Sequence, residues 1–331
     1  MNIICSELPP GTSRGRYAHF EHRDLGRDGW RRLDIRAAMT QRRQEWRQSL
    51  EAWHAELSRR AASLTRYWWL TDGSRLTAWY PFDLKPLFFA LALAEEYEKN
   101  PGQPLYAVGC PPEVAEYLTE LRTGRCPRRL AYSPQPVRAV SPLRLTASLA
   151  VRVLSRYLRP EPDAADADVI AFSYVLRGEI FEQQDDHYFG KALDELPGLS
   201  KDRAFWSYHL DHLRDGKRAA AALARRGRRH AFYFDFLSLA DIVDIRARSF
   251  RVLHDLAPLK RDLPPLEIGR FKSRAFSLRF FRDMIIHRAP IEEMSVYIAF
   301  ARMLRHTRAR TVVYPYEEKG IERALLFACG D

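Results

Sequence analysis

Hydrophobic and polar positions change their spacing along the chain, and each spacing predicts one kind of element. Residues 41–60 carry tryptophan and leucine at helical intervals, which predicts an amphipathic helix with arginines on its polar face. Beyond this helix, short apolar runs alternate with longer helical patterns. Strands are predicted at 67–71, 105–109, 129–132, 168–174, 204–210 and 230–236, and helices at 84–99, 112–122, 141–158, 187–196 and 216–226.

The alternation predicts an α/β fold. Residues 168–174 are almost all apolar, as expected for a strand that is buried on both faces of a parallel sheet. Strands that are separated by single helices form right-handed βαβ units. We therefore expect a Rossmann-like parallel sheet with flanking helices, which is the architecture of a GT-B-like N-terminal domain.

The same patterns predict the division of the chain into domains. An N-terminal extension with the amphipathic helix is expected over 1–65, a Rossmann-like domain on the acceptor side over 66–237, and a helical connector over 238–310. Residues 311–331 are expected to be the first strand and helix of a second α/β domain. Because the sequence ends at Asp331, we expect this second domain to be truncated.

Composition narrows the choice of partners. The chain has 53 Lys and Arg against 42 Asp and Glu, a formal net charge of +11, which favours polyanions such as phosphate-bearing substrates, anionic lipid or nucleic acid. Four widely spaced cysteines show neither a disulfide framework nor metal-ligand spacing, so we predict no metal site and a reducing, cytoplasmic setting. The longest apolar stretch is much shorter than the roughly 20 residues that span a bilayer, so we expect any membrane contact to be peripheral.

Several polar groups follow predicted strands, where α/β sheets bind their ligands. Ser173 and Tyr174 end a buried strand and are candidates for substrate contact. Asp83 lies in an aromatic link before a helix, where it could hold a sugar or simply cap the helix. The run Asp185-Asp186-His187 could serve acid–base chemistry or a metal, or could be a solvated turn.

A dense basic cluster precedes the predicted strand at 230–236. Its arginines, which are candidates for binding phosphate or a membrane surface, are Arg225, Arg226, Arg228 and Arg229. Cations also gather at helix C-termini for structural reasons, so both interpretations stay open. The arginines on the helix at 41–60 pose the same choice between a phosphate-binding face and a solvated one.

One segment resembles a known family. The pattern Tyr314-x-Tyr316-Glu317-x-x-Gly320-x-Glu322-x-Ala324-Leu325 is similar to the YxYExxxxExAL segment of bacterial surface-carbohydrate biosynthesis proteins. These are glycosyltransferase-like proteins of capsule and O-antigen clusters, with an expected GT-B fold. The order of the upstream elements is similar too. The resemblance implies transfer of a sugar from a nucleotide-activated donor to a glycan or a polyprenyl-linked acceptor, with no tightly bound cofactor.

The resemblance also assigns residues. It implies catalytic carboxylates at Glu317 and Glu322, with Tyr316 and Lys319 as substrate-binding residues. A structural alternative is that both carboxylates cap the helix and pair with Lys319 or Arg323.

Two other functions remain possible at this point. One is a non-catalytic basic α/β module that binds nucleic acid or an anionic membrane surface, although no RRM, KH or helix-turn-helix signature is present. The other is a truncated transferase that is inactive because its donor half is absent. Saturable binding of a nucleotide sugar separates the transferase from the binding module.

Overall fold

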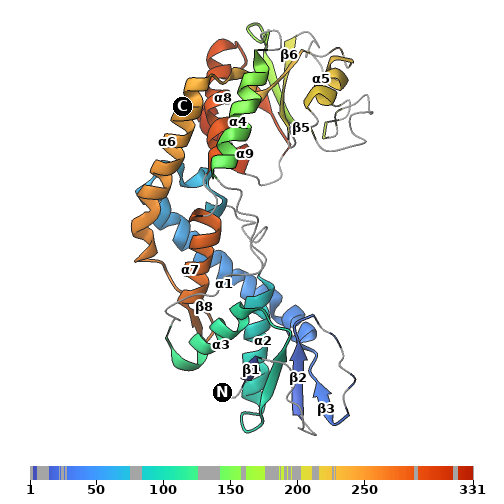
Figure 1. The fold of residues 1–331 in the computed structure, drawn as a ribbon, viewed down its shortest axis with the longest axis vertical. Helices are drawn as coiled ribbons and strands as arrows, with labels where there is room; N and C mark the ends of the chain where they lie inside the picture. The colour runs from blue at the N-terminus through green and yellow to red at the C-terminus, as the bar shows by residue number, and fades with distance from the viewer. Residues whose placement is uncertain are drawn as a thin grey trace. The chain divides into compact units, whose positions relative to one another are not determined.

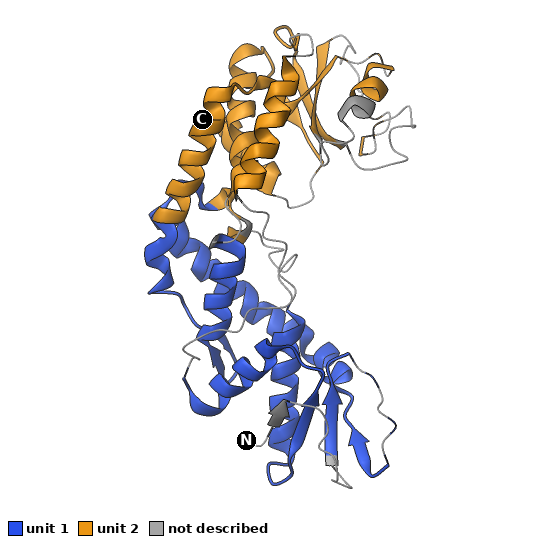
Figure 2. Cartoon of the chain, in the orientation of Figure 1, with its two compact units in different colours: residues 1–68, 76–139, 255–287 blue, residues 69–75, 140–254, 288–331 orange. Residues whose placement is uncertain are grey.

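The computed structural model describes most of the chain. The residues that it does not describe are 1–2, 6–14, 22, 24–25, 27, 75–83, 126–141, 158–161, 176–185, 187, 190–191, 193–194, 196–202, 211–215, 226, 228, 287–289, 316–319 and 331. The chain forms two compact units, each assembled from three separate stretches (Figure 2). Unit 1 contains residues 1–68, 76–139 and 255–287, and unit 2 contains residues 69–75, 140–254 and 288–331.

Unit 1 is built on a four-stranded parallel sheet. The order of its strands is β1 (Ile3–Cys5), β4 (Leu105–Val108), β2 (Gly15–His19) and β3 (Trp30–Arg32). Its helices are α1 (Ile35–Leu64), α2 (Lys85–Lys99), α3 (Pro112–Thr123) and α7 (Arg274–Phe280), and the last continues as a π-helix over Phe281–Ile286 (Figure 1). A short antiparallel pair, β8 (Leu266–Ile268) and β9 (Phe271–Ser273), precedes α7.

The amphipathic helix predicted near residues 41–60 is confirmed as α1. It begins where the Asp34 side chain accepts a hydrogen bond from the Ala37 N–H, a standard N-cap. Its tryptophan and leucine stripe is buried, and Trp53 lies with ring centroids 5.1 Å from both Phe276 and Phe280 of α7. The Trp53 indole N–H also donates to the main-chain oxygen of Pro264 at 2.8 Å, which satisfies its polar group within the core.

Unit 2 has a second four-stranded parallel sheet. The order of its strands is β10 (Thr311–Val313), β5 (Val169–Val175), β6 (Ala204–Leu210) and β7 (His230–Phe232). The helices α4 (Pro142–Arg156), α8 (Ile291–His306) and α9 (Gly320–Gly330) lie on one side of the sheet, and α5 (Gly216–Arg225) lies on the other (Figure 1). A 3-10 turn, η6 (Tyr233–Phe236), follows β7, and α6 (Leu239–Leu256) follows η6.

The α/β class with parallel, Rossmann-like sheets is confirmed, whereas the predicted division into domains is wrong. The sheet expected over 66–237 is two sheets, because β4 pairs in unit 1 whereas β5, β6 and β7 pair in unit 2. Residues 311–330 do not begin a new domain, since β10 pairs with β5 in the register Thr311 to Val169. Periodicity shows where a strand lies but contains no information about its partner, which explains both errors.

Some of the predicted elements also differ. The strand expected at 67–71 is replaced by a 3-10 helix over Arg66–Leu70, and β7 ends at Phe232 instead of continuing to 236. The expected helical connector contains the strands β8 and β9, and it contributes α7 to unit 1 but α8 to unit 2. The strand expected at 129–132 lies outside the described residues, as does most of the helix expected at 187–196.

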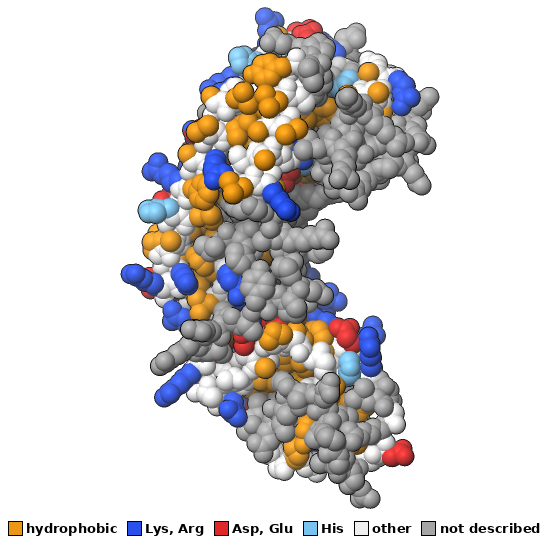
Figure 3. All heavy atoms as spheres, in the orientation of Figure 1, with side chains coloured by type: hydrophobic (Ala, Val, Ile, Leu, Met, Phe, Trp, Pro, Cys, Tyr) orange, Lys and Arg blue, Asp and Glu red, His pale blue; other side chains and the backbone are white. Residues whose placement is uncertain are grey.

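The described surface combines paired charges with a concentration of exposed apolar side chains. On α1, Arg42, Arg47, Arg59 and Arg60 all form ion pairs with glutamates, and the pKa of Glu56 falls to about 2 because Arg59 and Arg60 hydrogen-bond its carboxylate. This pairing favours a solvated face over a phosphate-binding one. Exposed hydrophobic side chains gather over unit 2, chiefly on α4 and α6 (Figure 3). Within the part of the chain that is described, no helix combines the length and the apolar character needed to cross a bilayer.

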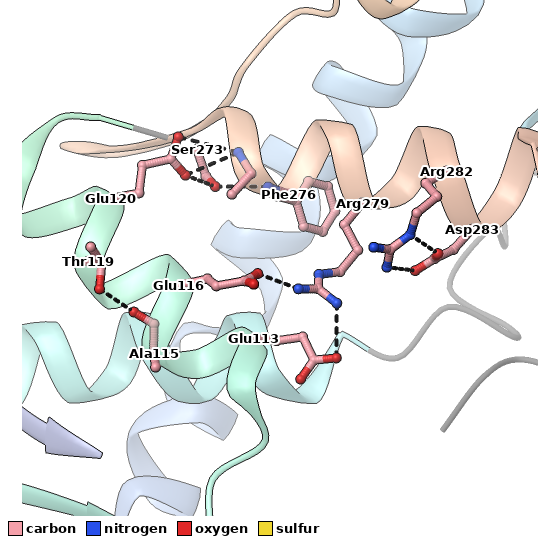
Figure 4. Close-up of polar contacts among 11 residues, drawn as sticks. Glu113, Ala115, Glu116, Thr119, Glu120, Ser273, Phe276, Arg279, Arg282 and Asp283 are labelled. Carbon is pink, nitrogen blue, oxygen red and sulfur yellow. Dashed lines mark hydrogen bonds and ion pairs between the residues drawn. The ribbon is translucent and has the colours of Figure 1, made fainter. Parts of the chain in front are cut away.

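A buried ion-pair cluster joins α3 to α7 inside unit 1 (Figure 4). The Arg279 guanidinium donates to Glu113 at 3.0 Å and also to Glu116, and all three side chains are almost fully buried. Glu120, one turn further along α3, accepts hydrogen bonds from the Ser273 hydroxyl and from the main-chain N–H groups of Arg274 and Ala275. These N–H groups belong to the first turn of α7, where a carboxylate is favourable.

Replacing Arg279 with methionine tests the importance of this cluster. We expect Arg279→Met to lower the free energy of unfolding by about 3–5 kcal/mol, because two buried carboxylates lose their counter-charge. Urea denaturation followed by circular dichroism measures this loss. The control is Arg282→Met, since Arg282 pairs with the adjacent Asp283 at a more exposed position and its loss is expected to cost about 1 kcal/mol or less. Equal losses in the two variants would show that the cluster is not a principal stabilising contact.

Candidate functional site

Three aromatic rings form a row at the carboxyl ends of the unit 2 strands. Tyr174 in β5 is the register partner of His209 in β6, and their ring centroids lie 5.6 Å apart. Tyr233, the residue after β7, stacks on His209 at 5.3 Å with an interplanar angle of 4°. Parallel strands all end at the same edge of their sheet, so three distant segments meet here. This edge is where α/β sheets bind ligands.

The carboxylate of Glu292, on α8, contacts the row of rings at His209. His209 Nε2 lies 2.9 Å from Glu292 Oε1, and Glu292 belongs to the first turn of α8. The His209 side chain is 3% exposed, whereas that of Glu292 is 41% exposed. The pair therefore places a solvent-accessible carboxylate on a buried imidazole, which fixes the orientation of the carboxylate.

The Tyr233 hydroxyl interacts with the polar side chains of Arg152, Glu292 and Ser295. Burial raises its pKa above the ordinary value and the Glu292 charge adds to the rise, whereas Arg152 and the Ser295 hydroxyl act in the opposite direction. Ser295 Oγ lies 3.3 Å from Tyr233 Oη and 2.6 Å from the main-chain oxygen of Glu292. Arg152 on α4 is 8% exposed, and its Nε has no hydrogen-bond partner among the residues that the structure describes.

A small pocket opens beside these groups. Its volume is about 30 Å³, room for about two water molecules. The residues that line it are Leu145, Ser148, Leu149, Arg152, Tyr233, Ile291, Glu292 and Ser295. It thus presents a guanidinium, a carboxylate and the three hydroxyls of Ser148, Tyr233 and Ser295 on an otherwise apolar lining. A hydroxyl-sized or anionic group of a larger ligand fits this chemistry. Among the described residues, no group of three or more His, Cys, Asp or Glu side chains could hold a metal ion.

The structure separates the predicted pair Ser173 and Tyr174, because successive residues of a strand face opposite sides of the sheet. Tyr174 is part of the aromatic row on the α8 side. Ser173 is fully buried and donates to Asp186 Oδ1 at 3.0 Å. Asp186 also accepts hydrogen bonds from the main-chain N–H groups of Tyr188 and Phe189, so it closes a turn. Asp185 and His187, the neighbours of Asp186 in its predicted site, lie outside the described residues.

The segment that carries the family resemblance lies at the same edge of the sheet. The chain runs from β5 through β6 to β7 in one direction, and β10 lies on the other side of β5. The chain therefore adds strands on one side of β5 and then places β10 on its other side, so the strand order reverses between β5 and β10. Such reversal points in α/β sheets commonly bind ligands. Tyr316, Glu317 and Lys319 lie outside the described residues, as does Asp83.

Glu322 is described, and it lies in the first turn of α9 with only 2% of its surface exposed. The adjacent Arg323 donates to the Ser74 hydroxyl. Gly320 lies so close to α8 that an added Cβ would come 2.8 Å from Cγ of Glu293. The first turns of α8 and α9 are therefore neighbours. The catalytic role of Glu322 stays a prediction.

The basic cluster lies elsewhere. Arg229 immediately precedes β7 and therefore lies at the amino edge of the sheet, opposite the pocket. It pairs with Asp166 at 2.5 Å and donates to the main-chain oxygen of Asp163, and it lowers the pKa of Asp166. Arg225 is exposed in the last turn of α5, and Arg226 and Arg228 lie outside the described residues. The contacts of Arg229 favour the structural interpretation of this cluster.

Sequence reasoning missed four residues of the site, namely Arg152, His209, Tyr233 and Glu292. His209 and Tyr233 fall inside the strands predicted at 204–210 and 230–236, and the available signal was the position of His209 near the end of its strand. Glu292 follows His209 by 83 positions, and no local pattern links the two. Arg152 is one of several arginines on its helix, and its burial becomes visible only in the folded unit.

Comparisons with protein-family models, with curated proteins and with solved structures give no match to this chain. The arrangement of the site therefore carries the argument for function.

The raised pKa of Tyr233 predicts a dependence of stability on alkaline pH. An unfolded tyrosine ionises near pH 10, whereas the folded protein keeps the Tyr233 proton to higher pH. The resulting stabilisation is complete below about pH 10 and is lost as pH rises through the folded pKa. This loss approaches about 1.4 kcal/mol per pH unit for each such group.

Tyr233→Phe should therefore reduce the alkaline slope of the unfolding free energy, measured by urea denaturation between about pH 9 and 11.5. The comparison variant is Tyr117→Phe in unit 1, because burial also raises the pKa of Tyr117. It should reduce the slope by a similar amount. An unchanged slope in Tyr233→Phe would contradict the buried, protonated phenol.

Proposed function

We propose that this protein is a glycosyltransferase-like protein of surface-polysaccharide biosynthesis. In this proposal it transfers a sugar from a nucleotide-activated donor to a glycan or lipid-linked acceptor. The support comes from two parallel-sheet α/β units, as a GT-B arrangement requires, and from the polar pocket at the carboxyl edge of unit 2. The segment that resembles surface-carbohydrate proteins reaches the same edge, since α9 begins beside the first turn of α8.

Arg152 is the observation that carries the proposal. A buried guanidinium with a donor left over, lining an open pocket, is suited to an anionic ligand, because burial strengthens its interaction with a counter-charge. Leu145, Leu149 and Ile291 line the pocket beside it and lower the local polarity. The donor diphosphate has the charge and hydrogen-bond acceptors that such a group binds.

Glu292 is the best-placed general base. A base must reach the hydroxyl whose proton it takes, and the exposed carboxylate of Glu292 borders a pocket that holds a hydroxyl-sized group. The buried side chain of Glu322 presents almost no surface for such a contact. His209 acts as a positioning residue, since it holds one oxygen of Glu292.

The chemical step uses these groups as follows. The acceptor oxygen forms a bond to the anomeric carbon of the sugar as its proton passes to Glu292. The bond between that carbon and the donor phosphate oxygen breaks, and the nucleoside diphosphate leaves with the electron pair. Arg152 stabilises the charge that develops on the leaving phosphate.

Replacing Glu292 with glutamine tests the base. We expect Glu292→Gln to slow sugar transfer about 10²- to 10⁴-fold, which is the usual contribution of general-base catalysis, with nucleotide binding retained. Transfer of labelled sugar from UDP-, GDP- and dTDP-linked donors to a bacterial lipid extract measures the rate. The matched control is Glu293→Gln on the next residue, which should keep its activity. A rate for Glu292→Gln within threefold of the wild type would exclude Glu292 as the base.

Replacing Arg152 with methionine tests anion binding. We expect Arg152→Met to weaken the binding of UDP, GDP or dTDP about 10- to 100-fold, which corresponds to the loss of one charge-assisted hydrogen bond. Isothermal titration calorimetry measures the affinity. Arg144→Met, an exposed position on the same helix, is the control and should bind like the wild type. If the wild-type protein binds none of these nucleotides, the proposal of a nucleotide-sugar transferase fails.

A further inference from the structure

Helix α4 exposes large hydrophobic side chains on the face that points away from the pocket. Its inner face buries Leu149 and Val153 together with Arg152. Its outer face carries Leu143, Val151 and Leu154, which are 64%, 56% and 50% exposed. These three positions recur at intervals of eight and three residues and so share one side of the helix. Apolar surface gathered in this way marks an interaction site.

Helix α4 itself carries charge of a single sign. Within α4 there are three arginines and no acidic residue. In the surrounding sequence, residues 121–160 contain no Asp or Glu. In unit 2 the described arginines of this stretch are Arg144, Arg152 and Arg156, all on α4. The charge that α4 carries is therefore positive, and Arg144 is exposed, which favours an anionic partner for this helix.

A second helix continues the apolar face. Arg156 at the end of α4 donates to the main-chain oxygen of Leu237 at 2.7 Å, so this end of α4 lies beside the start of α6. Helix α6 exposes Leu239, Val243 and Phe250, and the Arg246 guanidinium lies 5.2 Å from the Phe250 ring centroid. Figure 3 shows hydrophobic side chains gathered on this part of unit 2, with basic side chains among them and at their margin.

We propose that the outer face of α4 docks unit 2 on an anionic lipid bilayer. The helix lies in the plane of the interface, with Leu143, Val151 and Leu154 in the acyl boundary and Arg144 at the headgroups. A basic helix with an apolar face binds membranes in this way, through buried apolar area together with attraction to anionic lipid. Lipid offers both interactions, whereas a nucleic-acid backbone would leave the leucines in water. A second copy of the chain would bring like charges together.

Vesicle binding tests the proposal independently of sugar transfer. The probe is the full chain with vesicles of phosphatidylcholine containing about a third phosphatidylglycerol, assayed by sedimentation. We expect Leu154→Glu to lower the partition coefficient at least tenfold, because the variant loses one apolar anchor and gains repulsion. The matched control is Leu326→Glu on α9, which replaces another exposed helical leucine, 54% exposed, and should bind like the wild type.

Reversing the charge of Arg144 gives a second test of membrane binding. Arg144→Glu should weaken binding about 5- to 25-fold, and vesicles of phosphatidylcholine alone should bind far less protein than the mixed vesicles. Any one of four results would overturn the proposal: wild-type binding by Leu154→Glu, equal losses in Leu154→Glu and Leu326→Glu, equal binding to both vesicle types, or vesicle-independent dimerisation that Leu154→Glu abolishes. Tight binding of bulk double-stranded DNA without vesicle binding would assign the basic stretch to nucleic acid instead.

Discussion

The buried contact between Arg279 and the two glutamates of α3 is the constraint on which the rest of the structure depends. Three charges lie in the interior of unit 1, and each is tolerated only because the others are present. Glu113 and Glu116 come from the second stretch of unit 1, residues 76–139, and Arg279 comes from the third, more than 160 positions later. The cluster therefore joins α7 to α3, and the Glu120 carboxylate adds a second link because it accepts hydrogen bonds from the first turn of α7.

The site in unit 2 is built from segments that the chain's passage through unit 1 separates. The chain leaves unit 2 after α6, contributes residues 255–287 to unit 1, and returns to unit 2 with α8. His209 and Tyr233 precede this excursion, and Glu292 and Ser295 follow it. The contacts of Glu292 with His209 and of Ser295 with Tyr233 thus close a long loop of chain. Closing so long a loop costs entropy, which the packing of α8 and β10 onto the existing strands offsets.

Helix α4 links the two proposals. Its inner face places the Arg152 guanidinium in the pocket, where the proposed donor phosphate would lie. Its outer face carries the leucine and valine side chains proposed to enter a lipid surface. The same helix would serve chemistry and location through residues only one or two positions apart, such as Arg152 and Val151.

The sequence by itself determined most local structure, because helix and strand periods depend on near neighbours. The stripe of Trp46, Leu50, Trp53 and Leu57 specified α1, and the apolar run at 168–174 specified a buried strand. Ser173 and Tyr174 were correctly placed at a strand end. Partner choice was decided only by tertiary structure, since the pairing of β10 with β5 depends on packing between distant segments. For the same reason, the meeting of Arg152, His209, Tyr233 and Glu292 left no local trace, because burial and charge pairing exist only once the strands and helices of unit 2 are assembled.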